Sequence, residues 1–325
     1  MGVFLYAPMG VFLYAPVGVF LYAPVGVFLH APVGMFLHAS RECILHLERR
    51  YTSIRQVGRS KGSVTEITSR SNPLIKEYIG LRDSKRARRE QLAFVLEGAR
   101  LIEDAINEGV GIKYCFFSGE AAKKHESLVL RLERLTGGRA YKISDSLCGV
   151  LSDTSTSQGI FAAASALDKF NLIDKIKYGG KYMVLRNLQD PGNVGTIVRA
   201  ADAVGLDGIF LCGCADIYNP KTVRSTMGSM FRIPFDQSAE YSALVMLMKD
   251  SGLVTYASVV DGDAVDLREN TFEDACAIVI GNEGRGLSDG DTALCDKRIT
   301  IKMKGNIDSL NAATAASIFL WELTK

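Results

Sequence analysis

The chain has 325 residues, of which 47% are hydrophobic and 23% are charged, a balance that is typical of a globular protein long enough for two domains and excludes a largely disordered chain. The formal net charge of +2 excludes a uniformly basic protein. The basic character is local, because residues 41–100 hold fourteen Lys and Arg against seven Asp and Glu.

Residues 1–40 consist of five near-identical octads, from MGVFLYAP to VGMFLHAS, without Asp, Glu, Lys or Arg. A proline ends each of the first four octads and would interrupt a helix every eight residues, which disfavours a membrane span. The segment has no basic start and no defined cleavage site, so a secretory signal is not supported. We expect a low-complexity extension that is disordered or prone to aggregate and has no part in the chemistry, followed by a linker over residues 41–65.

Helical spacing begins shortly after this linker. Leu74, Tyr78 and Leu81 fall on one stripe of a predicted helix, which Ser71 can cap and Pro73 can begin. Further elements are predicted as a strand at 92–98, a helix at 99–108 and strands at 113–117 and 159–164. This alternation predicts a compact α/β domain over residues 66–167.

Residues 168–180 are polar, end in two glycines and are predicted to be a second linker. Beyond them, strands are predicted at residues 182–187, 208–212, 253–259, 276–280 and 298–303. They alternate with helical segments, which predicts an α/β domain over residues 181–325 with a mostly parallel sheet covered on both faces. Ligands of such sheets bind at the carboxyl ends of the strands.

Seven cysteines, at positions 43, 115, 148, 212, 214, 276 and 295, show no paired framework. We interpret them as reduced, buried thiols of a cytosolic protein. Cys212 and Cys214 form a CxC pair, but no histidine follows His125, so no metal site is expected. The same absence disfavours a histidine-based mechanism, unless His125 reaches across from the other domain.

Three sequence blocks begin where predicted strands end: NLQDPGNVGTIVRAADAVG (187–205), IGNEGRGLS (280–288) and IKMKGNIDSLNAATAASIFLWE (301–322). In the first, Asn193 or Gly195 is predicted to start a helix, whose free N–H groups favour an anion, and Arg199 offers a planar donor fork suited to phosphate. The second fits neither GxGxxG nor GxxxxGK[ST]. In the third, Ser309 and Asn311 flank a helix entry that either of them could cap.

In order and spacing these blocks resemble the three signature blocks of the SpoU (TrmH-like) branch of the SPOUT RNA methyltransferases. The phrases SNPLIK, FVLEGARL and LSDTSTSQGIFA resemble the substrate-binding domain that precedes the catalytic domain in many of these enzymes, so the resemblance covers residues 66–325. It implies a smaller α/β substrate-binding domain followed by a mostly parallel sheet with a C-terminal trefoil knot, an exception to the rule against threaded chains.

The same resemblance implies a homodimeric, S-adenosylmethionine-dependent RNA 2'-O-methyltransferase. The cysteines and the proline-interrupted octads in turn indicate a cytoplasmic protein with no membrane partner. The methyl acceptor would be a ribose 2'-hydroxyl of structured RNA, with ribosomal RNA favoured over transfer RNA because of the appended domain. Three alternatives stay open: a transfer RNA ribose methyltransferase, a base-methylating enzyme of the superfamily, and a catalytically silent RNA-binding or ribosome-assembly factor.

The resemblance also implies the site residues. Those at the active site are Asn193, Arg199, Glu283, Ser309 and Asn311. Those at the cofactor are Ile280, Gly281, Ile301, Met303 and Leu310, with Gly281 and the adenine-holding Ile301 and Leu310 acting through their backbones. In the family the arginine assists removal of the hydroxyl proton, and the acidic residue is expected to orient the arginine or the RNA.

A guanidinium stays protonated in almost any protein, so we expect Arg199 to clamp a phosphate and to stabilise the developing alkoxide. A transient role as base stays open. One position departs from the family pattern: Lys302 stands where the family usually has proline. Lysine keeps an N–H that proline lacks, so we expect a slightly altered loop that still binds the cofactor.

The run KRARR offers Lys85, Arg86, Arg88 and Arg89 to RNA phosphates without sequence preference. Its alternative is a solvated basic helix face. A fourth family-like block, residues 219–235, contains Arg224, which is expected to meet either RNA phosphate or a dimer partner.

Overall fold

The computed structural model describes residues 65–154, 156–167, 172–176, 179–237, 239–307 and 309–325, together with the backbone of four short strands in the first forty residues. These strands form two antiparallel pairs, β1 (Tyr6–Ala7) with β2 (Val11–Phe12) and β3 (Val19–Tyr22) with β4 (Phe28–Ala31). The other residues of the predicted extension and almost all of the predicted 41–65 linker lie outside the described part, so both predictions stay open. Residues 64–325 form one compact unit.

We expect a chain lacking residues 1–40 to fold and to transfer methyl groups like the full chain, because Val64–Lys325 is compact by itself. The measurement is thermal unfolding and methyl transfer of the truncated chain beside the full chain. A truncated chain that folds but has lost its activity would show that the octads take part in the chemistry.

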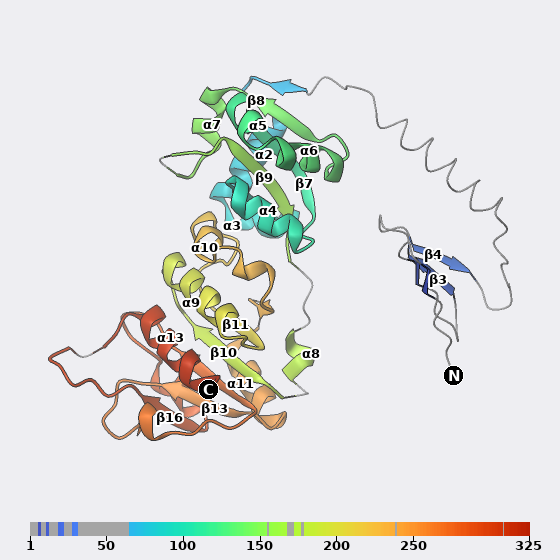
Figure 1. Cartoon of the computed structure of the whole chain (residues 1–325). Coiled ribbons are helices and arrows are strands. Elements are labelled where there is room, and N and C mark those ends of the chain that lie inside the picture. The colour runs from blue at the N-terminus through green and yellow to red at the C-terminus, as the bar shows by residue number, and fades with distance from the viewer. Residues whose placement is uncertain are drawn as a thin grey trace. The chain divides into compact units, whose positions relative to one another are not determined.

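A five-stranded sheet organises the first part of the larger unit, in the order β5-β8-β7-β9-β6 (Figure 1). Its strands are β5 (Glu66–Ile67), β6 (Ala93–Glu97), β7 (Ile112–Ser118), β8 (Ala140–Ile143) and β9 (Ile160–Ser165). Its helices are α2 (Pro73–Asp83), α3 (Lys85–Gln91), α4 (Ala99–Asn107), α5 (Gly119–Lys124), α6 (Glu126–Leu135) and α7 (Asp145–Leu151). Side chains of α2 and α7 pack on one face of the sheet and those of α4, α5 and α6 on the other. The predicted alternation is confirmed.

The N-terminus of α2 differs from its prediction in one detail. Asn72, and not Ser71, caps the helix, since its Oδ1 accepts a hydrogen bond of 2.9 Å from the Leu74 N–H. Pro73 is the first helical residue, as predicted, and this makes the residue directly before it the cap.

A seven-stranded sheet organises the second part, in the order β12-β11-β10-β15-β13-β16-β14, and all its described strand pairs are parallel. Its strands are β10 (Lys181–Arg186), β11 (Gly208–Cys212), β12 (Phe235–Asp236), β13 (Val254–Ser258), β14 (Val265–Asp266), β15 (Cys276–Ile280) and β16 (Lys297–Thr300). The predicted parallel sheet is confirmed. Strand β16 ends three residues before its predicted end, which leaves Ile301 and Met303 in the following loop.

Helices cover both faces of this sheet. They are α8 (Leu172–Ile176), α9 (Pro191–Ala203), α10 (Pro220–Ser225), α11 (Tyr241–Asp250), α12 (Asp289–Ala293) and α13 (Ala312–Leu323), with short 3₁₀ turns at Ser229–Phe231 and Leu267–Glu269. Side chains of α9 and α13 pack on one face, and those of α8 and α11 on the other. Helix α8 lies inside the predicted 168–180 linker, and its Leu172 and Ile176 are fully buried, so this connection is anchored to the sheet.

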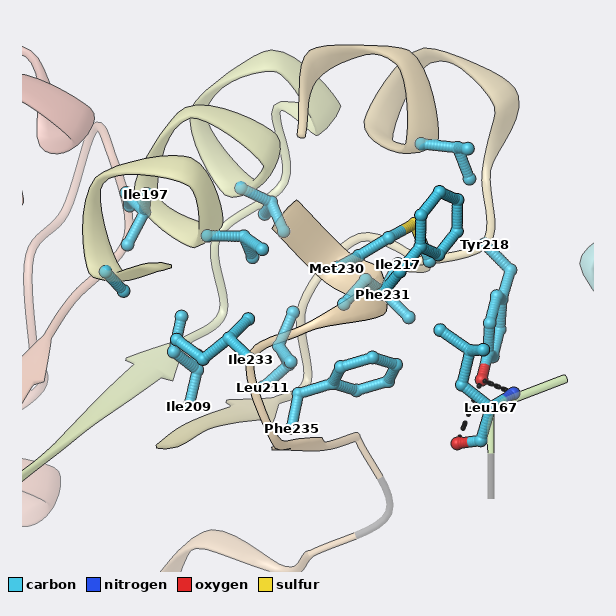
Figure 2. Packing of buried hydrophobic residues seen from close by; sticks show 14 of the residues in the cluster. Leu167, Ile197, Ile209, Leu211, Ile217, Tyr218, Met230, Phe231, Ile233 and Phe235 are labelled. Atoms are coloured by element: carbon cyan, nitrogen blue, oxygen red, sulfur yellow. Dashed lines mark hydrogen bonds between the residues drawn. The ribbon is translucent and has the colours of Figure 1, made fainter. Parts of the chain in front are cut away.

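One apolar cluster continues from the five-stranded sheet to the seven-stranded sheet. Tyr218, from the loop after β11, stacks on Phe94 of β6 with ring centroids 4.9 Å apart. The Leu167 N–H donates a 2.7 Å hydrogen bond to the Tyr218 hydroxyl, as Figure 2 shows beside the apolar side chains around α9 and β11. The two sheets therefore share an interior. Among the described residues, no helix has both the length and the apolar character that crossing a membrane requires.

Candidate functional site

Three loops meet at the carboxyl edge of the seven-stranded sheet. They follow β10, β15 and β16 and contain residues 187–190, 281–288 and 301–311. In a parallel sheet the carboxyl ends of all strands lie at one edge, which is where ligands bind. The three sequence blocks, far apart along the chain, are thereby brought to one place.

The Glu283 carboxylate joins the second loop to the first. Its Oε1 accepts hydrogen bonds from the Asp190 N–H (3.0 Å) and the Asn193 side-chain amide (3.2 Å), and its Oε2 accepts one from the Gln189 N–H (3.2 Å). Burial raises the pKa of Glu283, but these donors outweigh it and hold the pKa below its ordinary value. Glu283 is therefore a carboxylate at neutral pH and positions the first loop.

Asn311 joins the third loop to the first. Its Nδ2 donates a 3.1 Å hydrogen bond to Asn193 Oδ1. Its own Oδ1 caps α13 by accepting the Ala313 N–H at 2.9 Å. The sequence left two alternatives for Asn311, a helix cap or a site residue. In the structure its Oδ1 caps the helix and its Nδ2 contacts Asn193.

A cavity of about 880 Å³ opens beside this hydrogen-bond network. Part of its apolar wall comes from residues predicted to hold the cofactor, and Gly281 forms part of its lining. The lining residues with predicted cofactor roles are Ile280, Gly281, Ile301, Met303 and Leu310. The predicted active-site residues Glu283 and Ser309 also line it. Its size lies within the range of small-molecule sites, about 300 to 1,000 Å³.

Gly281 lines the cavity at a position where no side chain fits. A Cβ there would lie 2.3 Å from the Gly286 carbonyl carbon and 2.4 Å from the Leu287 nitrogen. Asn282 and Gly286 pair their backbones across the same turn, at 3.1 and 2.9 Å. The loop is therefore folded back tightly where it lines the cavity. This cradle and the apolar wall fit an adenosine group, whose ring needs apolar contact and backbone hydrogen bonds.

Lys302 is exposed between two residues that line the cavity, Ile301 and Met303. Its side chain does not line the cavity. The departure from the family's proline therefore adds no charge to the wall of the site.

Arg199 lies on α9 outside the cavity lining. Its side chain is exposed, and within the described residues it forms no hydrogen bond or ion pair. It is thus free to meet an anion. The helix also begins earlier than predicted, at Pro191, with Asp190 as its cap through a 2.9 Å hydrogen bond from the Asn193 N–H. Asn193 consequently sits inside the first turn.

The sequence reasoning missed three contributors to the site. Asp190 could have been found, since Asp before Pro is a common start of a helix. Asn282 shapes the second loop by donating to the Asn187 carbonyl (2.9 Å) and accepting from the Gly284 N–H (3.0 Å), and no spacing signal marks it. Residues 258–261 also line the cavity, and their only signal was the end of the predicted strand at 253–259.

The predicted RNA-binding residues are divided by the structure. Lys85, Arg86 and Arg89 on α3 are exposed. Arg88 is 5% exposed and its Nε donates to Asp216 Oδ2 at 2.7 Å, so the expectation that it contacts phosphate does not fit its position. Arg224 donates to Asp153 at 2.7 Å. The regular spacing of a basic run cannot reveal a partner that is 128 residues away in the sequence.

Comparisons with known proteins agree with this geometry. Residues 180–321 match the model of the SpoU rRNA Methylase family, and residues 72–162 match that of an MRM3-like substrate binding domain. The 23S rRNA (guanosine(2553)-2'-O)-methyltransferase RlmP of Bacillus subtilis is 31% identical over 262 residues, covering 79% of this chain and 98% of that protein.

Two comparisons lead to Streptomyces viridochromogenes. Its 23S rRNA (uridine(2479)-2'-O)-methyltransferase is 28% identical over 281 residues, covering 83% of this chain and 96% of that protein. The crystal structure of its SpoU methyltransferase AviRb in complex with AdoMet has a TM-score of 0.68 and 27% identity, covering 78% of this chain and 97% of the other.

Proposed function

The chain belongs to the SpoU rRNA methylase family, and from this premise we propose that it transfers a methyl group from S-adenosylmethionine to a ribose 2'-hydroxyl of ribosomal RNA. The observation that carries the proposal is the convergence of three distant loops on one cavity, held together by Glu283 and Asn311. A catalytically silent RNA-binding factor would not require this network or a glycine cradle.

The bound cofactor supplies an activated methyl group on a sulfonium. Gly281, Ile301 and Leu310 would hold it, through backbone groups and apolar contact. Methyl transfer then needs a ribose oxygen aligned with that methyl group, and the proton of the 2'-hydroxyl passes to solvent water as the new C–O bond forms. Ser309 lines the cavity, which supports a role for its hydroxyl in binding the ribose.

Arg199 acts on the RNA side of the reaction. Its exposed guanidinium binds the phosphate next to the target ribose and stabilises the negative charge that develops on the 2'-oxygen. Glu283 keeps the Asp190–Asn193 turn in place as a carboxylate and does not need to exchange a proton.

Replacing Glu283 by Gln is expected to lower kcat at least tenfold, because the amide NH2 of glutamine takes the place of one carboxylate oxygen and faces an N–H donor. The loss of one such positioning hydrogen bond costs about 1.5 kcal/mol, which corresponds to roughly tenfold in rate. The depressed pKa means that the carboxylate contacts are fully present above about pH 4.3 and are lost as the pH falls through the folded-state pKa. Wild-type turnover should thus show no Glu283 titration between pH 6 and 9, roughly the working range. Activity of the variant equal to wild type would remove Glu283 from the mechanism.

The proposal is tested with ribosomal RNA from cells that lack the gene. The purified full chain and radiolabelled S-adenosylmethionine should place label in that RNA, and nuclease digestion should release resistant dinucleotides, the mark of a 2'-O-methyl group. Label in free bases would indicate base methylation, and label in transfer RNA alone would indicate the transfer RNA alternative. Cofactor binding without any transfer to RNA would favour the silent factor.

RNA is held in part by α3 in this proposal. Lys85, Arg86 and Arg89 are exposed on one short helix and are suited to phosphate contacts, each of which adds to the salt dependence of binding. Arg86 already pairs with Glu90 at 2.6 Å, but an ion pair this exposed is weak and yields easily to a phosphate.

We also propose a homodimer in the cytoplasm, with the trefoil knot that the family resemblance implies. Support for the dimer comes from α13, where Ile318 and the 66%-exposed Trp321 present apolar surface to water. Support for the compartment comes from the unpaired cysteines among the described residues.

The Trp321→Glu variant is expected to shift the protein from dimer to monomer, because a charge in place of an interfacial indole opposes burial. Sedimentation velocity measures the change. Met246→Glu is the matched control, since Met246 is 59% exposed on α11, away from the α13 surface, and should leave the dimer intact. A monomeric wild-type protein, or a Trp321→Glu dimer, would contradict the proposed interface.

A further inference from the structure

A buried ion pair connects the two α/β parts of the larger unit. Arg88 of α3 donates to Asp216, in the loop after β11, at 2.7 Å, and the two side chains are only 4% and 8% exposed. The Arg88 guanidinium also donates to the carbonyls of Leu81 (2.7 Å) and Arg82 (3.0 Å). The second Asp216 oxygen accepts the Tyr218 N–H at 3.1 Å. Both charges are thus hydrogen-bonded on several sides, which is the condition under which a buried pair can persist.

The Asp216 side of this pair leads to the active site. Asn219, three residues on, caps α10, and Lys221 of α10 contacts Asp190 at 3.3 Å. Asp190 caps α9 and donates its backbone N–H to Glu283. Helices α9 and α10 also touch closely, since a Cβ on Gly195 would lie 2.8 Å from the Thr222 carbonyl oxygen. A continuous set of contacts therefore runs from Asp216 to the cavity.

The Arg88 side leads to the proposed RNA surface. Lys85 and Arg89 are exposed on the same two turns of α3 whose Arg88 points inward. A phosphate bound by these exposed side chains would thus be bound to a helix that the buried ion pair joins to the loop after β11.

We infer that Arg88 and Asp216 are positioning residues that keep the target ribose of a bound RNA aligned with the active site. The inference rests on the proposed function. The pair does not touch the cofactor or the reacting atoms, and its role is to keep the RNA-binding helix α3 and the catalytic loops in one register. Misplacement of a substrate by about 1 Å can cost about 10²-fold in rate even when the change is far from the chemistry.

The test replaces the whole pair, Arg88→Met with Asp216→Leu, because apolar substitution of a buried ion pair avoids an unpaired buried charge. In the full chain this variant should bind S-adenosylmethionine with unchanged stoichiometry and affinity and bind a ribosomal RNA fragment with affinity within about twofold of wild type. Its kcat on that fragment should fall about 10²-fold. Glu90→Gln, which removes the exposed Arg86–Glu90 pair from the same helix, is the matched control and should leave kcat unchanged.

A double-mutant cycle separates positioning from a merely structural role. The double change Lys85→Ala and Arg89→Ala should lower kcat/KM in the wild-type background. It should have a smaller effect in the variant that lacks the Arg88–Asp216 pair, because α3 is then no longer held in place relative to the catalytic loops. Additive effects, unchanged kcat in the pair variant, or a fall in cofactor stoichiometry that matches the loss of activity would each overturn the inference. If the pair variant does not fold, Arg88→Lys, which keeps the buried charge opposite Asp216 and loses the planar donor fork, takes its place with the same criteria. A wild-type chain that methylates no RNA would refute the proposed function instead.

Discussion

The Arg199→Ala variant should bind S-adenosylmethionine normally and lose methyl transfer by about 10²- to 10³-fold, the usual loss when one group that stabilises a developing oxyanion is removed. The expectation follows from its position, because Arg199 is exposed on α9 and does not line the cavity. Removing its side chain should leave the cofactor contacts intact. Calorimetric titration with the cofactor and single-turnover methylation of ribosomal RNA measure the two effects separately.

Two control variants make the result interpretable. Thr196→Ala changes another exposed side chain on the same helix and should have no effect. Arg199→Lys keeps the charge and loses the planar fork, so it should recover only part of the activity. Near-normal turnover of Arg199→Ala would exclude the arginine from the mechanism.

The Gly281→Ala variant should lose cofactor affinity by more than tenfold and lose methyl transfer with it. A methyl group at this position would overlap the Gly286 carbonyl carbon and the Leu287 nitrogen, both backbone atoms that cannot rotate away. The second loop must therefore open, which deforms the cavity lining and displaces Glu283. Overpacking of this kind typically costs about 1 to 3 kcal/mol, so the fold should survive.

Gly284→Ala is the matched control in the same loop. A Cβ on Gly284 would meet only Asn282 Oδ1, at 3.8 Å, which is ordinary contact. This variant should bind the cofactor as wild type does, and thermal unfolding should show both variants folded. Equal affinity of the two variants for S-adenosylmethionine would mean that the cofactor does not use this loop.

The sequence predicted the strands best where an apolar run is too short to form a helix. The ranges 208–212 and 276–280 match β11 and β15 residue for residue, because each is fully buried on both faces of the sheet. It could not predict the strand order, with β15 between β10 and β13, since that order depends on contacts between distant segments. The helix begins at Pro191 and not at the predicted Asn193 or Gly195, because Asp190 caps it.

The sequence predicted several of the residues that line the candidate site, but not which hydrogen bonds join them. The residues expected to hold the cofactor do line one cavity, and their binding role stays a prediction. That Glu283 bonds to the first loop, and not to Arg199, depends on backbone N–H groups, which any residue type supplies. Arg88 shows the opposite case, in which a charged residue within a basic run is turned inward by a carboxylate that the sequence places far away.

The stacking of Tyr218 on Phe94 bears on how this enzyme could be re-engineered. A chimera that replaces residues 66–167 by the matching segment of a relative would divide an apolar cluster that both parts of the unit share. The side chains of the relative would then pack against residues of this chain that fit other side chains. Retargeting by such an exchange should succeed only when the donor's segment that corresponds to residues 213–225 is transplanted along with it.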